Sequence, residues 1–282
     1  MSIIIGEISY TNILPFFYYL DREKLSEQNC SFVPQVPAQL NQGMSTGKID
    51  IGGISSFAYA ENAENFTLLP NLSVTSYGAV NSIFLFSKTP LKELDGKKIA
   101  LTTSSATSVH LLKVIVEYFH SLTVSYTMMK PDLNEMLREH DACLLIGDDA
   151  IRAKREQGHQ YHCYDLGELW YQHTGLPMTF AVFAVRNATL RDHPSLVGLV
   201  YRSFVDSKLK SEAIHYQPMI SDIVKTHGGE KAFWDSYFEN LCNDFGHREQ
   251  KGLSYFFELL AHMGYLSEQV KKLNIWNTVK ID

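Results

Sequence analysis

Over the first two thirds of the chain, hydrophobic residues fall into short apolar runs separated by amphipathic stretches. Runs rich in Ile, Val and Phe are typical of buried strands, and hydrophobic residues at helical spacing follow most of them. The predicted strands are 3–8, 31–36, 49–54, 83–87, 99–101, 124–128, 142–146, 161–164 and 180–185. This alternation of strand and helix is typical of an α/β protein with parallel strands.

The pattern changes after Pro194, where the hydrophobic spacing becomes helical throughout. The predicted helices are 196–209, 211–226, 230–240 and 250–263, and glycines at 228, 229 and 246 lie between them. The chain therefore combines an alternating α/β part with a helical C-terminal part.

Two apolar segments, 81–87 and 179–186, enclose a middle block that has its own alternation of strands and helices. Such a block is typical of a domain inserted into another and joined to it by two extended crossings. We therefore predict an α/β fold of two lobes, with residues 1–84 and 183–282 in lobe 1 and residues 85–182 in lobe 2. A cleft between such lobes encloses a small molecule when they close about a double hinge.

A run of hydroxyl residues lies between the predicted strand 99–101 and a helix predicted to begin near Ser105 or Ala106. The run consists of Thr102, Thr103, Ser104, Ser105, Thr107 and Ser108. Unpaired backbone N–H groups and the positive end of the helix dipole lie at such a position, so a carboxylate or phosphate can bind there without Lys or Arg. One hydroxyl is enough to cap the helix, and the surplus favours an anion-binding turn.

Two further turns between a strand and a helix are rich in hydroxyl and amide side chains. Ser55 and Ser56 follow the strand 49–54, and either can cap the next helix or bind a ligand. The segment from Ser9 to Asn12 precedes an apolar run with a proline in its first turn. Ligands of open α/β sheets bind beyond the carboxyl ends of the strands, so we predict that the three turns share one site.

The composition limits the classes of function. The chain has 282 residues, 45% of them hydrophobic, and its net charge of −6 argues against non-specific binding to nucleic acids. No apolar segment reaches the roughly 18 residues of a membrane helix, and no signal-peptide pattern opens the sequence, so we expect a cytoplasmic protein. The four cysteines lack zinc spacing, and neither a G-x-G-x-x-G run nor a P-loop is present, so no metal, nicotinamide or ATP cofactor is expected.

Taken in order, these motifs resemble chorismate dehydratase, the first enzyme of the futalosine route to menaquinone. The resemblance rests on Ser9 to Asn12 with Pro15, Gly47 to Ile51 with Ser55 and Ser56, Leu94 to Ala100, Thr102 to Ser108, Leu144 to Ala150, Tyr164 to Glu168, Trp170, and Thr174 to Pro177. Position 11 is Thr where the family is expected to have Leu. The resemblance implies the type II periplasmic-binding-protein-like fold, in agreement with the two predicted lobes.

The resemblance implies a reaction, the removal of water from the small molecule chorismate to give 3-[(1-carboxyvinyl)oxy]benzoate, without a cofactor. Chorismate has two carboxylates and a leaving hydroxyl, which a site rich in hydroxyl and backbone N–H donors can hold. The ring carboxylate acidifies the departing proton through the ring double bond, so donors are needed where negative charge collects. Aromatisation of the ring then drives the elimination.

We assign roles to the residues on the basis of this resemblance. Asn12 is the expected catalytic residue, hydrogen bonded near the reacting carbon or the departing hydroxyl. The expected substrate-binding residues are Ser9, Ser55, Ser56, Asn81, Ser82, Thr103, Ser104, Ser105, Thr107 and Asp148. The hydroxyl run would hold one carboxylate, and Ser55 and Ser56, aided by Ser82, would hold the other.

The proton chemistry has two open points. Asn12 is neutral and a poor base, so the proton goes either to another group or to the enolpyruvyl carboxylate of the substrate itself. Asp148 is a candidate acid for the leaving hydroxyl, but Asp148 and Asp149 can equally cap the helix that follows them.

Two other functions compete with the dehydratase. The first is 1,4-dihydroxy-6-naphthoate synthase, an enzyme of the same fold and pathway that relies on a histidine in the cleft. The segment 144–150 offers aspartates and no histidine, which favours the dehydratase. The second is a solute-binding protein for a carboxylate, against which the missing signal sequence and lipid-anchor cysteine argue. Whether the protein forms a homodimer is left open.

Overall fold

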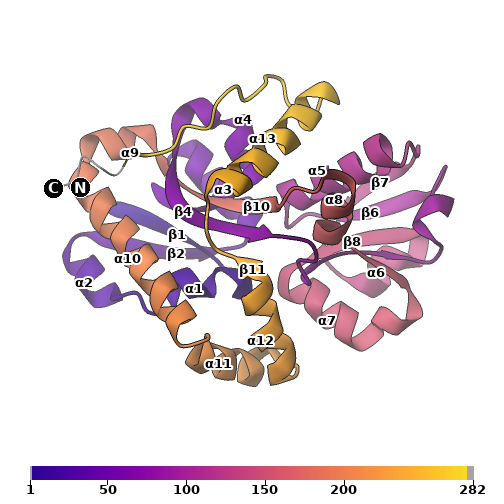
Figure 1. Cartoon of the computed structure of the whole chain (residues 1–282), viewed down its shortest axis with the longest axis horizontal. Helices are drawn as coiled ribbons and strands as arrows, with labels where there is room; N and C mark the ends of the chain where they lie inside the picture. Colours follow the sequence, from indigo (N-terminus) through magenta and orange to yellow (C-terminus); the bar gives the residue numbers. More distant parts are fainter. Residues whose placement is uncertain (1, 278–282) are drawn as a thin grey trace.

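The computed structural model describes residues 2–277, which form two β-sheets in the two halves of an elongated molecule (Figure 1). The six-stranded sheet has the order β11-β4-β10-β3-β1-β2, and the five-stranded sheet has the order β7-β6-β8-β5-β9. Each sheet, together with the helices packed on it, is called a lobe below. The first lobe carries the six strands and the second lobe the five.

Each predicted strand is confirmed to within about two residues. The strands of the first lobe are β1 (Ile3–Ile8), β2 (Cys30–Gln35), β3 (Ile51–Ser55), β4 (Phe66–Ser76), β10 (Met178–Arg186) and β11 (Leu241–Cys242). The strands of the second lobe are β5 (Ile83–Ser87), β6 (Lys98–Thr102), β7 (Ser125–Met129), β8 (Ala142–Ile146) and β9 (His162–Asp165). The strands β4 and β11 were not predicted.

The predicted parallel pairing is correct for part of each sheet. The strand β1 is parallel to β2 and β3, and β6 is parallel to β7 and β8. The strand β10 is antiparallel to both of its neighbours, and so is β5. Both sheets are therefore mixed. In β3, β5 and β8 every residue is buried, as in strands covered on both faces.

Helices cover the faces of both sheets (Figure 1). Between the strands lie the 3₁₀ turn η1 (Thr11–Ile13), α1 (Leu14–Phe17), α2 (Arg22–Glu27), α3 (Pro37–Thr46), α4 (Ser56–Glu61), α5 (Ala106–Lys113), the π-helix η4 (Val114–Phe119), α6 (Leu133–Glu139), α7 (Gly147–Gln157) and α8 (Leu166–Thr174). After β10 come α9 (Asn187–Asp192), α10 (Pro194–Ala213), α11 (Gln217–His227), α12 (Lys231–Asn240) and α13 (His247–His262). The four helices predicted in the last third are confirmed as α10 to α13, but the predicted boundary near residue 210 is wrong, because α10 continues to Ala213 and α11 begins at Gln217.

The chain passes between the lobes twice. It leaves β4 for β5 through residues 77–82, and it returns from α8 to β10 through residues 175–177. The strand β10 pairs with β4 from Met178 to Arg186, so residues 178–182 lie in the sheet of the first lobe. The predicted division at 85–182 stays a prediction, and this pairing favours limits nearer to 83 and 177.

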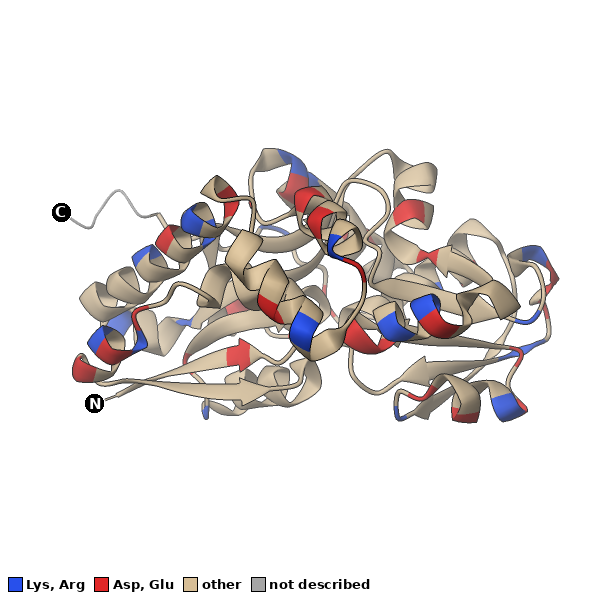
Figure 2. Ribbon diagram, turned by 90° about the horizontal axis from the view of Figure 1, so that it is seen from below, with Lys and Arg blue, Asp and Glu red and all other residues tan. Residues whose placement is uncertain are grey.

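Charged residues of both signs are interspersed over the helices of both lobes (Figure 2). All four cysteines are free; Cys30 and Cys143 are buried, and Cys163 and Cys242 are partly exposed. Within residues 2–277, no helix combines the length and the apolar character needed to span a bilayer. Over the same residues, no group of three or more His, Cys, Asp or Glu is placed to hold a metal ion.

Candidate functional site

Four turns that follow strands meet where the two lobes face each other. They follow β1, β3, β6 and β8 and lead into η1, α4, α5 and α7. The N–H of Phe57 in α4 donates to Oγ1 of Thr107 in α5 at 3.0 Å, and the hydroxyl of Thr11 in η1 donates to Asp148 in α7 at 2.6 Å. The structure therefore brings the three predicted turns together and adds the turn before α7.

Ser55 and Ser56 hold the start of α4. Oγ of Ser55 accepts the N–H of Ala58 at 3.2 Å and the side-chain amide of Asn41 at 3.1 Å. The hydroxyl of Ser56 is fully buried and donates to the carbonyl of Thr179 in β10 at 2.7 Å. Ser55 is thus the N-cap of α4, while its hydroxyl hydrogen has no acceptor among residues 2–277.

The hydroxyl run lies at the start of α5, which begins at Ala106 as predicted. Ser105 is the N-cap and accepts the N–H of Ser108 at 3.1 Å. Thr107 is buried, and its Oγ1 accepts the N–H of Phe57 across the lobes. Thr103 is exposed. The run therefore supplies one cap, one contact between the lobes and further hydroxyls beside the helix N-terminus.

Tyr10 packs against Gly147, and the sequence did not single out this contact. Gly147 has a φ of +59°, and a Cβ there would lie 2.8 Å from the ring of Tyr10. Burial raises the pKa of the Tyr10 phenol, and a hydrogen bond with Ser104 lowers it in part. The ring of Tyr10 therefore joins the turn after β1 to the turns before α5 and α7. The glycine in the Ile-Gly-Asp-Asp segment was the signal for such a close approach.

Asp148 lies at the start of α7 and contacts the first lobe. Its Oδ1 accepts the hydroxyl of Thr11, and its Oδ2 accepts the N–H of Thr11 at 3.2 Å. Nε2 of His227, at the end of α11, lies 3.6 Å from Oδ2 of Asp148. Burial raises the pKa of the Asp148 carboxyl, and the hydroxyl of Thr11 lowers it in part.

The alternative in which Asp148 caps α7 is wrong. The N-cap position of α7 is Ile146, which makes no side-chain cap, and the carboxylate of Asp148 is instead bonded to Thr11. Asp149 pairs with Arg152 one turn along the helix, at 2.7 Å.

Asn12 lies in η1, between Thr11, which contacts the second lobe, and the buried Ile13. Its Oδ1 is buried and has no hydrogen-bond partner among residues 2–277. The side chains of Gln35, Thr89, Tyr126 and Asn243 also have a buried atom without a partner among these residues, so what sets Asn12 apart is its place next to Thr11 at the junction of the lobes.

Ser82 is buried in the crossing, immediately before β5, and accepts the hydroxyl of Tyr237 at 3.2 Å. Asn81 has a φ of +58°, and its N–H donates to Asp165 at 2.7 Å. Ser9 is exposed, and its N–H donates to Gln35 at 3.0 Å, which continues the pairing of β1 with β2. The ligand roles of these residues stay predictions.

Two side chains of the C-terminal helices reach this region without having been predicted. They are His227 of α11 and Tyr237 of α12, which contact Asp148 and Ser82 respectively. Burial raises the pKa of the Tyr237 phenol. These two residues were not predicted because the resemblance to the family ended near residue 186. Helical spacing alone also does not show which face of α11 or α12 lies against the second lobe.

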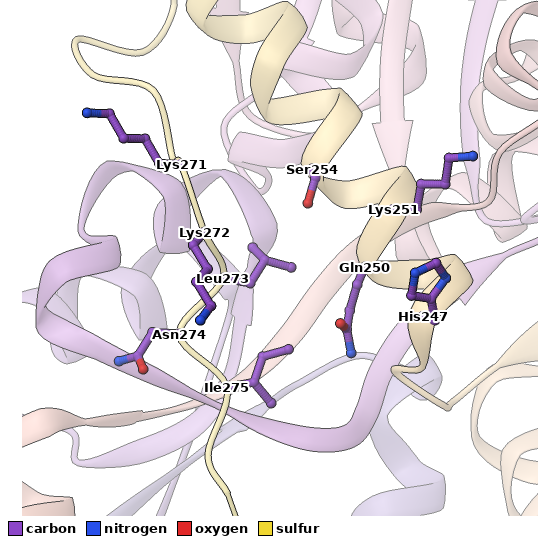
Figure 3. Close-up of a pocket in the computed structure, with 9 residues that line it drawn as sticks. All are labelled: His247, Gln250, Lys251, Ser254, Lys271, Lys272, Leu273, Asn274 and Ile275. Atoms are coloured by element: carbon purple, nitrogen blue, oxygen red, sulfur yellow. The ribbon is translucent and has the colours of Figure 1, made fainter.

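A groove of about 870 Å³ lies elsewhere, between α13 and residues 271–275. Figure 3 shows Gln250 and Ser254 of α13 on one side of this groove and Leu273 and Ile275 on the other. None of its lining residues belongs to the four turns, so it is separate from the candidate site.

Comparison with known proteins agrees with the sequence motifs. A family model described as menaquinone biosynthesis matches residues 3–262. A protein of Thermus thermophilus named chorismate dehydratase is 34% identical over an alignment of 211 residues that covers 70% of this chain and 73% of the relative. A protein of the same name from Campylobacter jejuni is 28% identical over 184 residues, covering 64% of this chain and 66% of the relative.

Solved structures show the fold. The periplasmic aliphatic sulphonate binding protein SsuA of Escherichia coli has a TM-score of 0.71 at 14% identity, covering 100% of this chain and 94% of its own. The Candida albicans CA3427 gene product, described as having the generic periplasmic binding protein fold, has a TM-score of 0.67 at 13% identity, covering 100% of both chains. The expected periplasmic-binding-protein-like fold is therefore confirmed.

Proposed function

We infer the function of this chain from one premise: it belongs to the menaquinone biosynthesis family. We propose that it is a chorismate dehydratase, a hydro-lyase that removes water from chorismate to give 3-[(1-carboxyvinyl)oxy]benzoate. The names of its relatives support this activity, and the motifs quoted above support a place in the futalosine route. A cytoplasmic location is part of the same proposal.

The observation that carries the proposal is the buried, unpaired Oδ1 of Asn12 at the junction of the lobes. A carboxamide in this state can accept a hydrogen bond from the departing hydroxyl while its NH₂ group donates to the same region of the substrate. The amide lies in η1, one residue after Thr11, whose hydroxyl is bonded to Asp148 of the second lobe. Asn12 would thus orient the substrate and stabilise the reacting geometry.

The carboxylates of the substrate require donors, and two hydroxyls at the junction can supply them. Oγ of Ser55 and Oγ1 of Thr107 each accept backbone or amide hydrogens, and each keeps a hydroxyl hydrogen without an acceptor among residues 2–277. Such hydrogens can donate to a carboxylate without breaking an existing bond. The N-terminus of α5, with Ser104 and Ser105, favours negative charge at the same place.

The elimination moves one proton and one hydroxyl. The C–H bond of the carbon bearing the enolpyruvyl ether breaks, its proton passes to the enolpyruvyl carboxylate of the substrate or to another group, and its electron pair spreads to the ring carboxylate. The C–O bond of the hydroxyl then breaks as the ring becomes aromatic, and the hydroxyl leaves with that proton as water. Donors at the ring carboxylate stabilise the charge that collects there. Both oxygens of Asp148 accept hydrogen bonds from Thr11, so we assign Asp148 to holding the lobes together and not to protonating the leaving group.

The direct test mixes the purified protein with chorismate, without metal or nucleotide. Loss of the cyclohexadiene absorbance is followed together with the mass of the products. A product lighter by one water that keeps the enolpyruvyl group is the expected result. Unchanged chorismate would contradict the proposal and favour the naphthoate synthase or a carboxylate-binding protein.

A further inference from the structure

A second cavity, of about 560 Å³, lies beside the first crossing between the lobes. Its lining comes from the crossing at Ala79 and Asn81, from β5, α7, β9 and α8 of the second lobe, and from the start of α12 next to the first lobe. Of the expected catalytic and substrate-binding residues, Asn81 alone belongs to this lining. The cavity therefore has walls on both sides of the junction, and its shape depends on how the lobes are arranged.

The wall of this cavity is largely apolar. Phe84 of β5, Ile151 of α7 and Phe233 of α12 contribute to it, and Phe233 is 36% exposed. Cavities of several hundred Å³ with apolar walls and a few polar groups are typical of sites for small organic ligands. The two phenylalanines favour a ligand with an aromatic ring.

Lys154 is the cation of this lining that lacks a counter-ion. Its Nζ lies 5.6 Å from the centre of the Phe84 ring, and it forms no ion pair within residues 2–277. Arg155 is already engaged, because Nη1 donates to the carbonyl of His227 and Nη2 to Glu156, each at 3.3 Å. A carboxylate on the ligand would supply the partner that Lys154 lacks.

None of the three acidic residues of the lining forms an ion pair with Lys154 within residues 2–277. Asp165 accepts the backbone N–H groups of Val80, Asn81 and Glu168. The carboxylate of Glu168 accepts the side-chain amide of Gln172 at 3.3 Å. Glu230 is exposed at the start of α12, where water solvates it.

We propose that this cavity binds an aromatic carboxylate, with its ring against Phe84 and Phe233 and its acid group at Lys154. The ligand is a second one, distinct from the substrate of the cleft, and its binding favours the arrangement of the lobes in which both walls are present. A test of this effect through enzyme activity rests on the proposed dehydratase function, whereas a test through binding does not.

His227 contacts two residues of α7, one in the candidate site and one in the lining of the cavity. Nε2 of its ring lies 3.6 Å from Asp148 of the candidate site, and its carbonyl accepts Arg155 of the cavity lining at 3.3 Å. The turn that follows is fitted to Arg155, since Gly229 has a φ of +87° and a Cβ there would lie 3.2 Å from the guanidinium. A ligand that fixes α7 against the start of α12 therefore acts on the same helix that carries Asp148.

The first experiment measures binding by titration calorimetry, with 2-naphthoate as the probe because two fused rings suit a cavity of this volume. The neutral analogue 2-naphthalenemethanol keeps the rings and removes the charge. We expect the alcohol to bind at least about tenfold more weakly, the effect of losing one charge-assisted hydrogen bond. No binding of 2-naphthoate, or equal binding of the two compounds, would overturn the proposal.

Matched lysine variants locate the acid group. Lys154→Met keeps the length of the side chain and removes its charge, and we expect at least about tenfold weaker binding of 2-naphthoate. Lys251→Met makes the same change of net charge at the separate groove of α13 (Figure 3), and there the expected loss is less than about twofold. Equal effects of the two variants would contradict the site.

Cysteine labelling locates the ring and separates this cavity from the cleft. Cys163 lines the cavity and is partly exposed, whereas Cys242 lies outside the lining and serves as an internal reference. With 2-naphthoate at about ten times its Kd, N-ethylmaleimide should react with Cys163 about tenfold more slowly, with Cys242 unchanged. An unreactive Cys163, or equal protection of both thiols, would overturn the proposal.

The binding should also persist in Asn12→Ala, because that change lies in the cleft. Loss of 2-naphthoate binding in Asn12→Ala would place the ligand in the cleft and overturn the second site. None of these readouts depends on turnover of chorismate, so a failure here is distinguishable from a failure of the proposed function.

Discussion

The hydroxyl of Thr11 donates a 2.6 Å hydrogen bond to Oδ1 of Asp148, and this bond joins the two lobes next to Asn12. The N–H of Thr11 donates to the other carboxylate oxygen, so Asp148 is held by both donors of one residue. Leu, which the family resemblance led us to expect at position 11, would keep the N–H contact and lose the hydroxyl. The hydroxyl bond is therefore a feature that this chain owes to its own Thr11.

Thr11→Val removes that hydroxyl while keeping a branched side chain of similar size. A hydrogen bond to a charged group is worth about 1.5–3 kcal/mol, so we expect kcat/KM for chorismate to fall by about tenfold or more. The melting temperature should fall by a few degrees as well, because Thr11 is buried and its bond to Asp148 is also lost on unfolding. Thr11→Ser, which keeps the hydroxyl, is the control, and an unchanged kcat/KM in Thr11→Val would show that the bond does not support catalysis.

Asn12→Ala tests the carboxamide with the unpaired oxygen. We expect kcat to fall by about a hundredfold or more, the usual effect of removing a group that orients or stabilises the reacting atoms. The side chain makes no hydrogen bond through Oδ1 within residues 2–277, so the unfolding free energy should be nearly unchanged. Steady-state kinetics and thermal unfolding of the same preparation give both quantities. Near-normal turnover would remove Asn12 from the mechanism.

Much of the fold followed from the sequence, because buried strands and helix starts leave local signals. Ser55 and Ser105 are N-caps where hydroxyls followed an apolar run. The strand β4 was missed because Pro70 and Asn71 in its middle are typical of a turn. Asn71 has a φ of +58°, and the register of β4 with β10 shifts in this stretch, so the strand continues around an irregularity that breaks its pattern.

The candidate site was predictable only where its residues follow a strand. Thr107 and Asp148 could be singled out, but their bonds to Phe57 and Thr11 depend on how two lobes face each other. His227 gave no local signal, since it reaches Asp148 from a helix 79 positions further along the chain. Contacts of this kind arise from tertiary packing, which periodicity does not encode.

Gly147→Ala tests the contact between Gly147 and the ring of Tyr10. The backbone there has a φ of +59°, and the added Cβ would lie 2.8 Å from the ring, so Tyr10 or the start of α7 must move. We expect kcat/KM to fall by about tenfold or more, because a shift of about 1 Å in a site is enough for such a loss.

Gly175→Ala is the matched control for backbone strain. Gly175 has a φ of +65°, and nothing lies within 4 Å of a Cβ at this position. Alanine in the left-handed backbone region should lower the unfolding free energy of both variants by about 1 kcal/mol. Only Gly147→Ala should also lower kcat/KM. Equal activity of the two variants would contradict a role for the contact with Tyr10.

His110 of α5 gives the protein a pH-dependent stability. Its ring stacks on Phe57 of the first lobe, with ring centres 3.6 Å apart, and its Nδ1 lies 2.9 Å from the carbonyl of Ala106. The ring of Tyr265 lies 5.4 Å away, and Lys113 is on the same helix. Burial lowers the pKa of His110 to about 4, the bond to Ala106 opposes this shift, and Lys113 adds to it.

The direction of the effect follows from the two protonation states. Between pH 4 and about 6.5 the unfolded chain binds a proton at His110 and the folded chain does not, so the unfolding free energy falls as the pH drops through this window. A shift of this size corresponds to a loss of about 2–3 kcal/mol between pH 7 and pH 4. His110→Phe keeps a ring on Phe57 and removes the titration. Between pH 7 and pH 4 its unfolding free energy should therefore fall by about 2–3 kcal/mol less than that of the wild type.

Urea unfolding at pH 7, 5.5 and 4.5 measures this difference at three points of the window. The control is His159→Phe, since His159 is exposed in the 3₁₀ turn that follows α7. Parallel curves for the wild type and His110→Phe would mean that His110 takes up its proton in the folded protein over the same pH range as in the unfolded chain. In that case the stack on Phe57 would be a cation–π contact, and the junction of the lobes would carry a positive charge beside the hydroxyl run.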